Sequence, residues 1–141
     1  MTRSRILLFL ILILSSVAIW SCGEPKANPS SNVIGTLTPV PPEFAGQTNP
    51  FGADAAIKGA EIYRNNCESC HGRQGRGDGP TGAALVPAPK NLALLQTLVG
   101  DDYLFWRITG GKDGTAMIAW KDVLTEEQIW QIIAFIRTLK Q

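Results

Sequence analysis

The stretch Cys67-Glu68-Ser69-Cys70-His71 decides how the rest of this sequence is interpreted. It has the C-x-x-C-H pattern by which proteins attach haem covalently. Its two thiols are separated by about one helical turn, so both can reach the vinyl groups on one edge of a porphyrin. His71 follows directly and is the only histidine of the chain. The stretch therefore predicts one covalently bound haem c with the His71 imidazole as an axial ligand of the iron.

Two other uses of paired cysteines stay open at this point. A C-x-x-C pair in a βαβ setting indicates a thioredoxin-like dithiol, and cysteines together with histidine can bind zinc. A structural zinc site needs four ligands, however, and the one further cysteine, Cys22, lies in a predicted export segment. No strand pattern precedes Cys67, which disfavours the dithiol. Haem attachment is the leading interpretation.

Met117 is the candidate for the second axial ligand. It is the only methionine besides Met1, and it lies 46 residues after His71 within a glycine-rich segment, residues 110–120. A lone methionine on a helix face is usually a packing residue, but glycines leave the backbone free to fold over a bound group. We therefore expect His71 and Met117 to bind the iron from its two sides.

Residues 1–22 predict an export segment. Arg3 and Arg5 precede an unbroken apolar run over residues 6–14, which is the pattern of a secretory signal peptide. The apolar stretch ends at residue 20 and is fifteen residues long, shorter than the roughly 20 residues that cross a bilayer. Haem attachment to C-x-x-C-H takes place outside the cytoplasm, so the export segment and the motif predict the same compartment.

The end of this segment, Ile19-Trp20-Ser21-Cys22, resembles a bacterial lipobox, in which the cysteine is lipidated and becomes the mature N-terminus. Trp20 departs from that pattern, because small or short aliphatic residues are usual there. An uncleaved signal anchor and simple secretion stay open as alternatives. Lipidation of Cys22 and an uncleaved anchor both predict tethering at the outer, extracytoplasmic face of the cytoplasmic membrane.

Residues 23–50 predict a flexible linker, and residues 51–141 predict a single haem domain. The linker stretch holds six of the nine prolines and almost no apolar periodicity, a composition that cannot bury enough surface to fold. The alternative is that it lies along a partner subunit. Over residues 51–141, ten Lys and Arg balance ten Asp and Glu, which disfavours nucleic-acid binding because that function needs a basic face.

The domain is predicted to be all-α, with about four short helices around the haem. Gly59 lies within the first helix, where it costs about 1 kcal/mol relative to Ala, so we expect another helix to cross closely there. Arg137 and Lys140 are expected in the last turn of the final helix, where they favour the helix dipole. The predicted helices cover residues 54–66, 91–98, 101–109 and 125–140.

Helix ends are indicated by capping residues. Thr125 and Gln128 form a capping box at the start of the last helix. Asp101 is the expected N-cap of the helix over residues 101–109, and Gly110 is expected just beyond its end.

The segment between the motif and the second helix, residues 72–90, is predicted to be a loop because it holds five glycines and three prolines. An axial histidine generally donates its second N–H to an oxygen, and the carbonyl of Pro87 or Pro89 is the expected acceptor. Tyr103 and Trp106 are expected either to reach the haem propionates or to lie in the core.

From about residue 53 onward the sequence resembles the class I c-type cytochromes. The resemblance rests on Cys67, Cys70 and His71, on Gly59 and Tyr63, on Met117-Ile118-Ala119-Trp120, and on Leu124-Thr125-Glu126-Glu127-Gln128-Ile129-Trp130 with Ala134-Phe135-Ile136. It implies the cytochrome c fold, in which the first and last helices cross near a glycine and an aromatic residue. Gly59 and Tyr63 would then lie against Ile132 and Phe135. Ile118 departs from the pattern, since many relatives have proline there.

The resemblance and the ligand pair imply one-electron transfer from a membrane donor complex to a downstream acceptor. His and Met ligation favours a comparatively high potential and leaves no open iron site, so we expect no catalysis by this chain alone. The exposed haem edge near Arg73 and Arg76 is the expected docking surface for a partner with an acidic rim. Electrostatic steering should then weaken with added salt.

Two alternatives keep the haem but change its use. The chain could be a fixed subunit of a membrane quinol-oxidising or oxidase assembly, resembling the tethered mono-haem lipoproteins of alternative complex III. It could also be a haem-based gas sensor, in which an exogenous ligand binds the iron at an exchangeable distal position.

Overall fold

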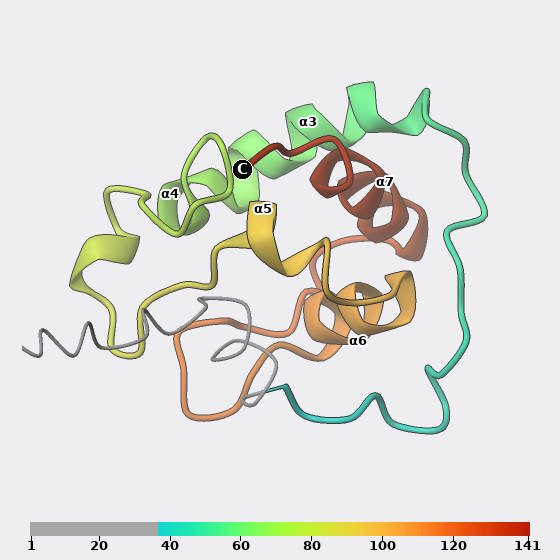
Figure 1. The fold of residues 1–141 in the computed structure, drawn as a ribbon, viewed down its shortest axis with the longest axis horizontal. Coiled ribbons are helices and arrows are strands. Elements are labelled where there is room, and N and C mark those ends of the chain that lie inside the picture. The colour runs from blue at the N-terminus through green and yellow to red at the C-terminus, as the bar shows by residue number, and fades with distance from the viewer. Residues whose placement is uncertain (1–36) are drawn as a thin grey trace, which may run out of the picture.

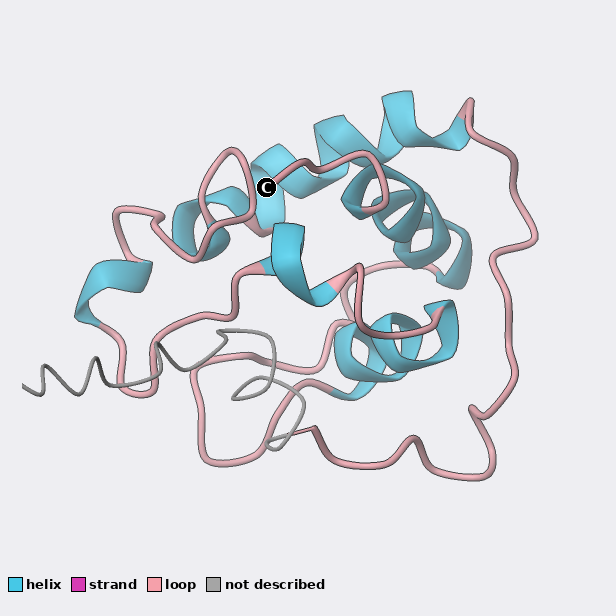
Figure 2. Ribbon diagram, viewed as in Figure 1, coloured by secondary structure: helices cyan, strands magenta, loops and turns pink. Residues whose placement is uncertain are grey.

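A computed structural model of the chain describes residues 37–141. The predicted export segment with Cys22 and residues 23–36 of the predicted linker lie outside the described residues. Residues 37–141 form five α-helices and a short 3-10 helix joined by long loops, with no strand (Figures 1 and 2). The helices are α3 (Ala55–Asn66), α4 (Glu68–His71), α5 (Leu92–Leu95), α6 (Asp101–Gly110) and α7 (Glu126–Ile136), and the 3-10 helix is Gly82–Ala84.

The all-α prediction is confirmed. Helix α4 was not predicted as a helix of its own, because its residues belong to the haem-attachment motif. Within residues 37–141, no helix combines the length and the apolar composition needed to cross a bilayer.

The packing of α3 against α7 organises the fold. The two helices lie side by side in Figure 1 and make the most extensive contact between helices in the described part of the chain. A Cβ atom added to Gly59 would lie 1.8 Å from the backbone oxygen of Gln131, so only glycine permits this approach. One turn later, the Tyr63 and Phe135 rings pack with centroids 4.9 Å apart. The predicted crossing at Gly59 is therefore confirmed.

Helix α7 begins as predicted but ends earlier. The Thr125 hydroxyl accepts from the Gln128 backbone N–H at 3.2 Å, and the Gln128 side chain accepts from the Thr125 N–H at 2.9 Å, which completes the capping box. The helix stops at Ile136, so Arg137 and Lys140 do not lie in its last turn, and that prediction was wrong.

The early end of α7 has a tertiary cause, because Arg137 is the C-cap residue and its guanidinium is held by three groups. It forms an ion pair with Asp101 at 2.6 Å, donates to the carbonyl of Val99 at 3.0 Å, and also donates to the carbonyl of Gln96. These contacts tie the end of α7 to the segment that leads into α6.

The ends of α6 also differ from expectation. Its N-cap is Gly100 and its C-cap is Gly111, which adopts φ +69°, a left-handed conformation that favours glycine. Asp101 lies inside the helix, and its carboxylate accepts from the backbone N–H of Asn49 at 3.0 Å as well as binding Arg137. The side chain expected to cap α6 is thus used to join three separate segments.

The described part of the predicted linker packs on the helical domain. Phe44 contacts Phe105 with ring centroids 6.1 Å apart, and the Asn49 side chain donates to the carbonyl of Trp130 at 2.8 Å. Gly46 N–H donates to the Asp102 carboxylate at 3.0 Å. Residues 37–50 therefore lie against α6 and α7, and a flexible linker stays a prediction for residues 23–36.

Candidate haem site

A cavity of about 250 Å³ lies between the end of α3, α4, α6 and the loops over residues 85–92 and 112–120. Cys67, Cys70 and His71 line it from the α4 turn. Met117 lines it from the loop after α6, together with Ile118 and Trp120. The structure thus brings all four sequence-predicted haem residues of the domain to one cavity, while Cys22 lies outside the described residues. Its remaining walls are mainly apolar, with Leu92, Leu95, Leu104, Ile108, Ile132 and Ile136 among them.

The His71 ring is oriented by the loop that follows it. Its Nδ1 lies 3.2 Å from the backbone oxygen of Lys90. Because a carbonyl only accepts, this bond requires the proton on Nδ1 and leaves the Nε2 lone pair free for a metal. Burial lowers the pKa of His71, and the bond to Lys90 opposes that shift only in part, so the imidazole is held neutral.

The prediction that the carbonyl of Pro87 or Pro89 accepts this hydrogen bond was therefore wrong. The acceptor is the carbonyl of the residue that follows Pro89. Gly77 explains the offset. Its N–H donates to the carbonyl of His71 at 2.8 Å, and a Cβ added to it would lie 2.5 Å from the Pro89 oxygen. The Pro89 carbonyl therefore lies against Gly77, and the next carbonyl, that of Lys90, faces the His71 ring.

Both cysteines of the motif are half-buried. Burial raises the pKa of the Cys67 thiol to about 12, and the neighbouring Cys70 adds to the shift. Within residues 37–141, no three His, Cys, Asp or Glu side chains gather as a metal-ligand cluster.

The backbone of Met117 is fixed on both sides. Its N–H donates to the Thr115 hydroxyl at 3.1 Å, and its carbonyl accepts from the Lys112 N–H at 2.9 Å. A Cβ added to Gly111 would lie 2.7 Å from the Met117 oxygen, so glycine is required where this loop folds back. These bonds hold the loop around Met117 without a proline at position 118.

Arg107 is a cavity residue that the sequence analysis missed. Its guanidinium carbon lies 3.7 Å from the centre of the Trp106 ring, and its Nε is buried without a hydrogen-bond partner among the described residues. Tyr103, one turn earlier, also lines the cavity and is 9% exposed, whereas Trp106 is not among the cavity residues. The i, i+4 spacing of Tyr103 and Arg107 on one helix was the only available signal.

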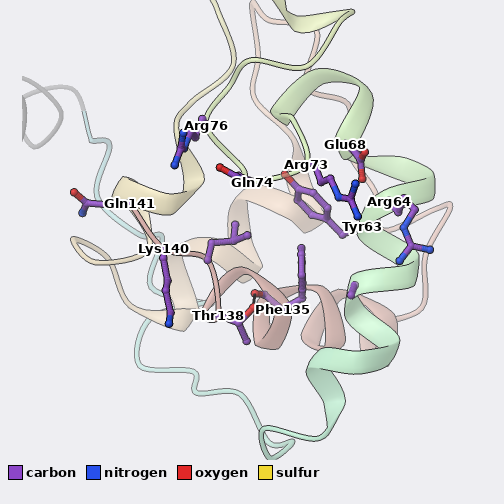
Figure 3. Close-up of a pocket in the computed structure, with 12 residues that line it drawn as sticks. Tyr63, Arg64, Glu68, Arg73, Gln74, Arg76, Phe135, Thr138, Lys140 and Gln141 are labelled. Atoms are coloured by element: carbon purple, nitrogen blue, oxygen red, sulfur yellow. Dashed lines mark hydrogen bonds between the residues drawn. The ribbon is translucent and has the colours of Figure 1, made fainter.

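Arg73 and Arg76 do not line this cavity. They lie beside a second pocket with Arg64 and Lys140, which is shown in Figure 3. Tyr63 lines both, and its hydroxyl donates to the carbonyl of Gly72 at 2.8 Å.

Comparison with known proteins places the chain among electron-transfer haem proteins. Residues 54–136, more than half of the chain, match the family described as cytochrome c oxidase, cbb3-type, subunit III. The chain is 36% identical over 92 residues to the cbb3-type cytochrome c oxidase subunit FixP of Azorhizobium caulinodans, a match that covers 64% of this chain and 29% of FixP. It is 26% identical to cytochrome c550 of Pseudomonas aeruginosa, over 92% of this chain and 91% of that protein.

A solved structure has the same fold at low identity. It is a reducing HAO-like protein complex of Kuenenia stuttgartiensis, with a TM-score of 0.56 and 22% identity over 78% of this chain and 55% of the matched chain. The chain thus spans less than a third of FixP and about half of this structure, so the similarity concerns a haem domain.

Proposed function

Because the chain belongs to the family of cytochrome c oxidase, cbb3-type, subunit III, and carries the covalent haem c of c-type cytochromes, we propose that it is a membrane-tethered electron carrier. It would pass single electrons between a membrane donor complex and a downstream acceptor. Electron transfer by a haem c follows from the family, whereas the tether and the two partners are parts of the proposal.

The observation that carries the proposal is that one cavity is lined by Cys67, Cys70, His71 and Met117. In the proposal, Cys67 and Cys70 hold the porphyrin through thioethers, and His71 and Met117 bind its iron. Haem c, when bound, supplies reversible one-electron chemistry, and His with Met ligation raises its potential. The chain's own contribution is to orient His71 through Lys90, to fix Met117 through Thr115, and to exclude water with apolar walls.

The cavity residues fit a haem in a second respect. The Arg107 Nε is buried and lacks an acceptor within the described residues, and a buried donor without a partner costs about 1–3 kcal/mol. A haem propionate is a carboxylate and would supply the missing acceptor. Stacking on Trp106 holds the guanidinium in place for such a contact.

The proposed domain division keeps an export and anchoring segment at residues 1–22, with lipidation at Cys22. A spacer follows from residue 23, and the haem domain begins at residue 51, with residues 37–50 packed on its surface. This arrangement would place the haem at the outer face of the cytoplasmic membrane. Mass spectrometry of the mature N-terminus separates lipidation from an uncleaved anchor and from secretion.

A second candidate is a fixed haem subunit of a membrane oxidase or quinol-oxidising assembly. The description of the family and the name of FixP favour it, since both are oxidase subunits. Purification of the membrane complexes in mild detergent separates the two candidates. A carrier is lost during purification, whereas a subunit stays in constant ratio to the complex.

The proposed ligands are tested by redox titration with optical spectra on the full chain expressed with its haem-maturation machinery. We expect a low-spin oxidised protein that titrates reversibly as a single one-electron centre. Met117→Ala should keep the covalent haem but become high-spin, with a lower midpoint potential, because the thioether ligand is lost.

Val123→Ala is the matched control, because it shortens a 60% exposed side chain outside the cavity lining and should leave the spectrum unchanged. If the wild-type protein is high-spin when oxidised, or binds carbon monoxide without displacing Met117, the carrier proposal is overturned in favour of a gas-binding protein.

A further inference from the structure

A second pocket, of about 480 Å³, opens on the surface between α3, the loop after α4 and the segment after α7 (Figure 3). Its floor is apolar and is formed by Tyr63, Phe135 and Leu139. Its rim carries four cations from the three segments, namely Arg64, Arg73, Arg76 and Lys140. We call this site the basic pocket.

The cations of the basic pocket outnumber its acidic side chains. All four are exposed, and within residues 37–141 the recorded ion pair is the one between Arg137 and Asp101, away from this pocket. Glu68 is the one acidic side chain in the lining. The domain as a whole is neutral, so this surplus of positive charge is a local feature. It creates a field that favours an incoming anion.

The pocket is also placed for contact with a protein that exchanges electrons with this chain. Glu68 belongs to the haem-attachment stretch, and Arg73 follows His71 by two residues. Tyr63 lines both the basic pocket and the haem cavity. A partner bound in the basic pocket would therefore sit one side chain away from the haem cavity.

We propose that the basic pocket is the docking site for an extended acidic segment of the redox partner, with carboxylates on both sides of an apolar side chain. The carboxylates would meet the cationic rim and the apolar side chain would cover the floor. That the protein carrying this segment is a redox partner rests on the proposed function, whereas the binding of an acidic segment does not. The concave shape favours a protein segment over a flat anionic membrane, and the apolar floor favours it over a free phosphate.

The probe for the test is the peptide acetyl-Asp-Glu-Phe-Glu-Asp-amide, titrated into the reduced full-length holoprotein and followed by amide NMR shifts at low ionic strength. We expect the largest shifts at residues 60–64, 73–76 and 138–141, and weaker binding as salt is added. The double variant Arg73→Gln/Arg76→Gln should bind about tenfold more weakly, the loss expected for two exposed ion pairs of about 0.7 kcal/mol each. Thr138→Glu, which places a carboxylate at the pocket lining, should also weaken binding.

The matched control is Lys58→Gln/Lys121→Gln, which removes two exposed cations outside the pocket and should leave the affinity within about twofold. Equal weakening by this control, or equal binding of acetyl-Asn-Gln-Phe-Gln-Asn-amide, would show non-specific attraction and overturn the proposal. Binding of inorganic phosphate or phosphatidylglycerol vesicles at these residues without binding of the peptide would overturn it in favour of a small-anion or lipid site.

This experiment can fail independently of the proposed function. Peptide binding does not require electron transfer, and the optical titration does not require a peptide. If the peptide binds but the oxidised protein is high-spin, the docking site stands and the carrier function is overturned. If the protein is low-spin and titrates reversibly but does not bind the peptide, the carrier function stands and the docking site is overturned.

Discussion

The haem cavity and the basic pocket share the Tyr63 side chain but are built in different ways. The cavity is lined by apolar side chains and takes three of its four predicted haem residues, Cys67, Cys70 and His71, from one short motif. The basic pocket takes its cations from residues 64, 73, 76 and 140, which come together only because α3 and α7 pack side by side. One region is specified by a motif and the other by the fold.

The difference also concerns energy. The apolar walls of the cavity include the buried side chains of Leu104, Ile132 and Ile136, whose burial stabilises the fold, whereas exposed cations contribute little to stability. Substitutions that leave the cavity without its haem should therefore destabilise the fold, whereas substitutions of the exposed cations of the basic pocket should remove only an interaction.

The largest expected effect is that of Cys67→Ser/Cys70→Ser. Without thioethers the cavity of about 250 Å³ loses its covalent filling, and its apolar walls lose the group they pack against. A small domain has only about 5–15 kcal/mol of stability, so this loss should unfold much of the protein. We expect no covalent haem on a denaturing gel and little helical signal by circular dichroism.

Ser69→Ala is the control for the motif, because it changes the exposed residue between the cysteines and should retain the haem. A stable, helical double serine variant would contradict the dependence of the fold on the bound porphyrin.

The next largest effect should follow from Gly59→Ala, which acts on both regions at once. A Cβ at this position would lie 1.8 Å from the Gln131 oxygen, so α3 must move away from α7. We expect the free energy of unfolding to fall by about 3 kcal/mol or more, measured by denaturant titration of the holoprotein. Gly110→Ala, where an added Cβ meets nothing within 4 Å, should change it by no more than about 1 kcal/mol.

The sequence was sufficient where a feature depends on neighbouring residues. Thr125 and Gln128 form the capping box because both partners lie within one turn, and Gly59 marked the helix crossing because glycine is costly inside a helix. The meeting of His71 and Met117 at one cavity was also predictable, since the chain has no other histidine and no other methionine besides Met1.

The sequence was insufficient where a distant contact overrides a local preference. Helix α7 could continue to Lys140 by propensity, but Arg137 is captured by groups from residues 96, 99 and 101. The acceptor for His71 depends on how the loop passes Gly77, and the basic pocket depends on three segments meeting. Such contacts are set by tertiary packing, which periodicity and composition do not encode.

An intermediate effect is expected for Tyr63→Phe at the boundary between the two regions. The variant loses the hydrogen bond to the Gly72 carbonyl, at a cost of about 0.5–1.5 kcal/mol. Burial raises the pKa of Tyr63, and the negative charges of Glu68 and Asp78 raise it further. The folded protein thus keeps the phenol proton above pH 10, where the unfolded chain releases it.

The pH dependence follows from this shift. A raised folded-state pKa gives stability that is fully present below about pH 10 and is lost as the pH rises beyond it. The stability difference between wild type and Tyr63→Phe should therefore be constant between pH 7 and 9 and shrink above pH 10 in urea titrations. A difference that stays constant to pH 11 would contradict the assigned pKa shift.

The smallest effect on stability is expected for Arg73→Gln/Arg76→Gln in the basic pocket. Four exposed cations with one acidic neighbour repel one another, so removing two of them should leave the free energy of unfolding unchanged or raise it by up to about 0.5 kcal/mol at low salt. The gain should disappear near 1 M salt, where the Debye length is about 3 Å. Urea titrations of the holoprotein at the two salt concentrations measure it, with Lys58→Gln/Lys121→Gln as the control for removing two exposed charges elsewhere. A loss of more than about 1 kcal/mol would mean that these arginines hold the fold together, and the contrast between a structural cavity and an interaction pocket would not stand.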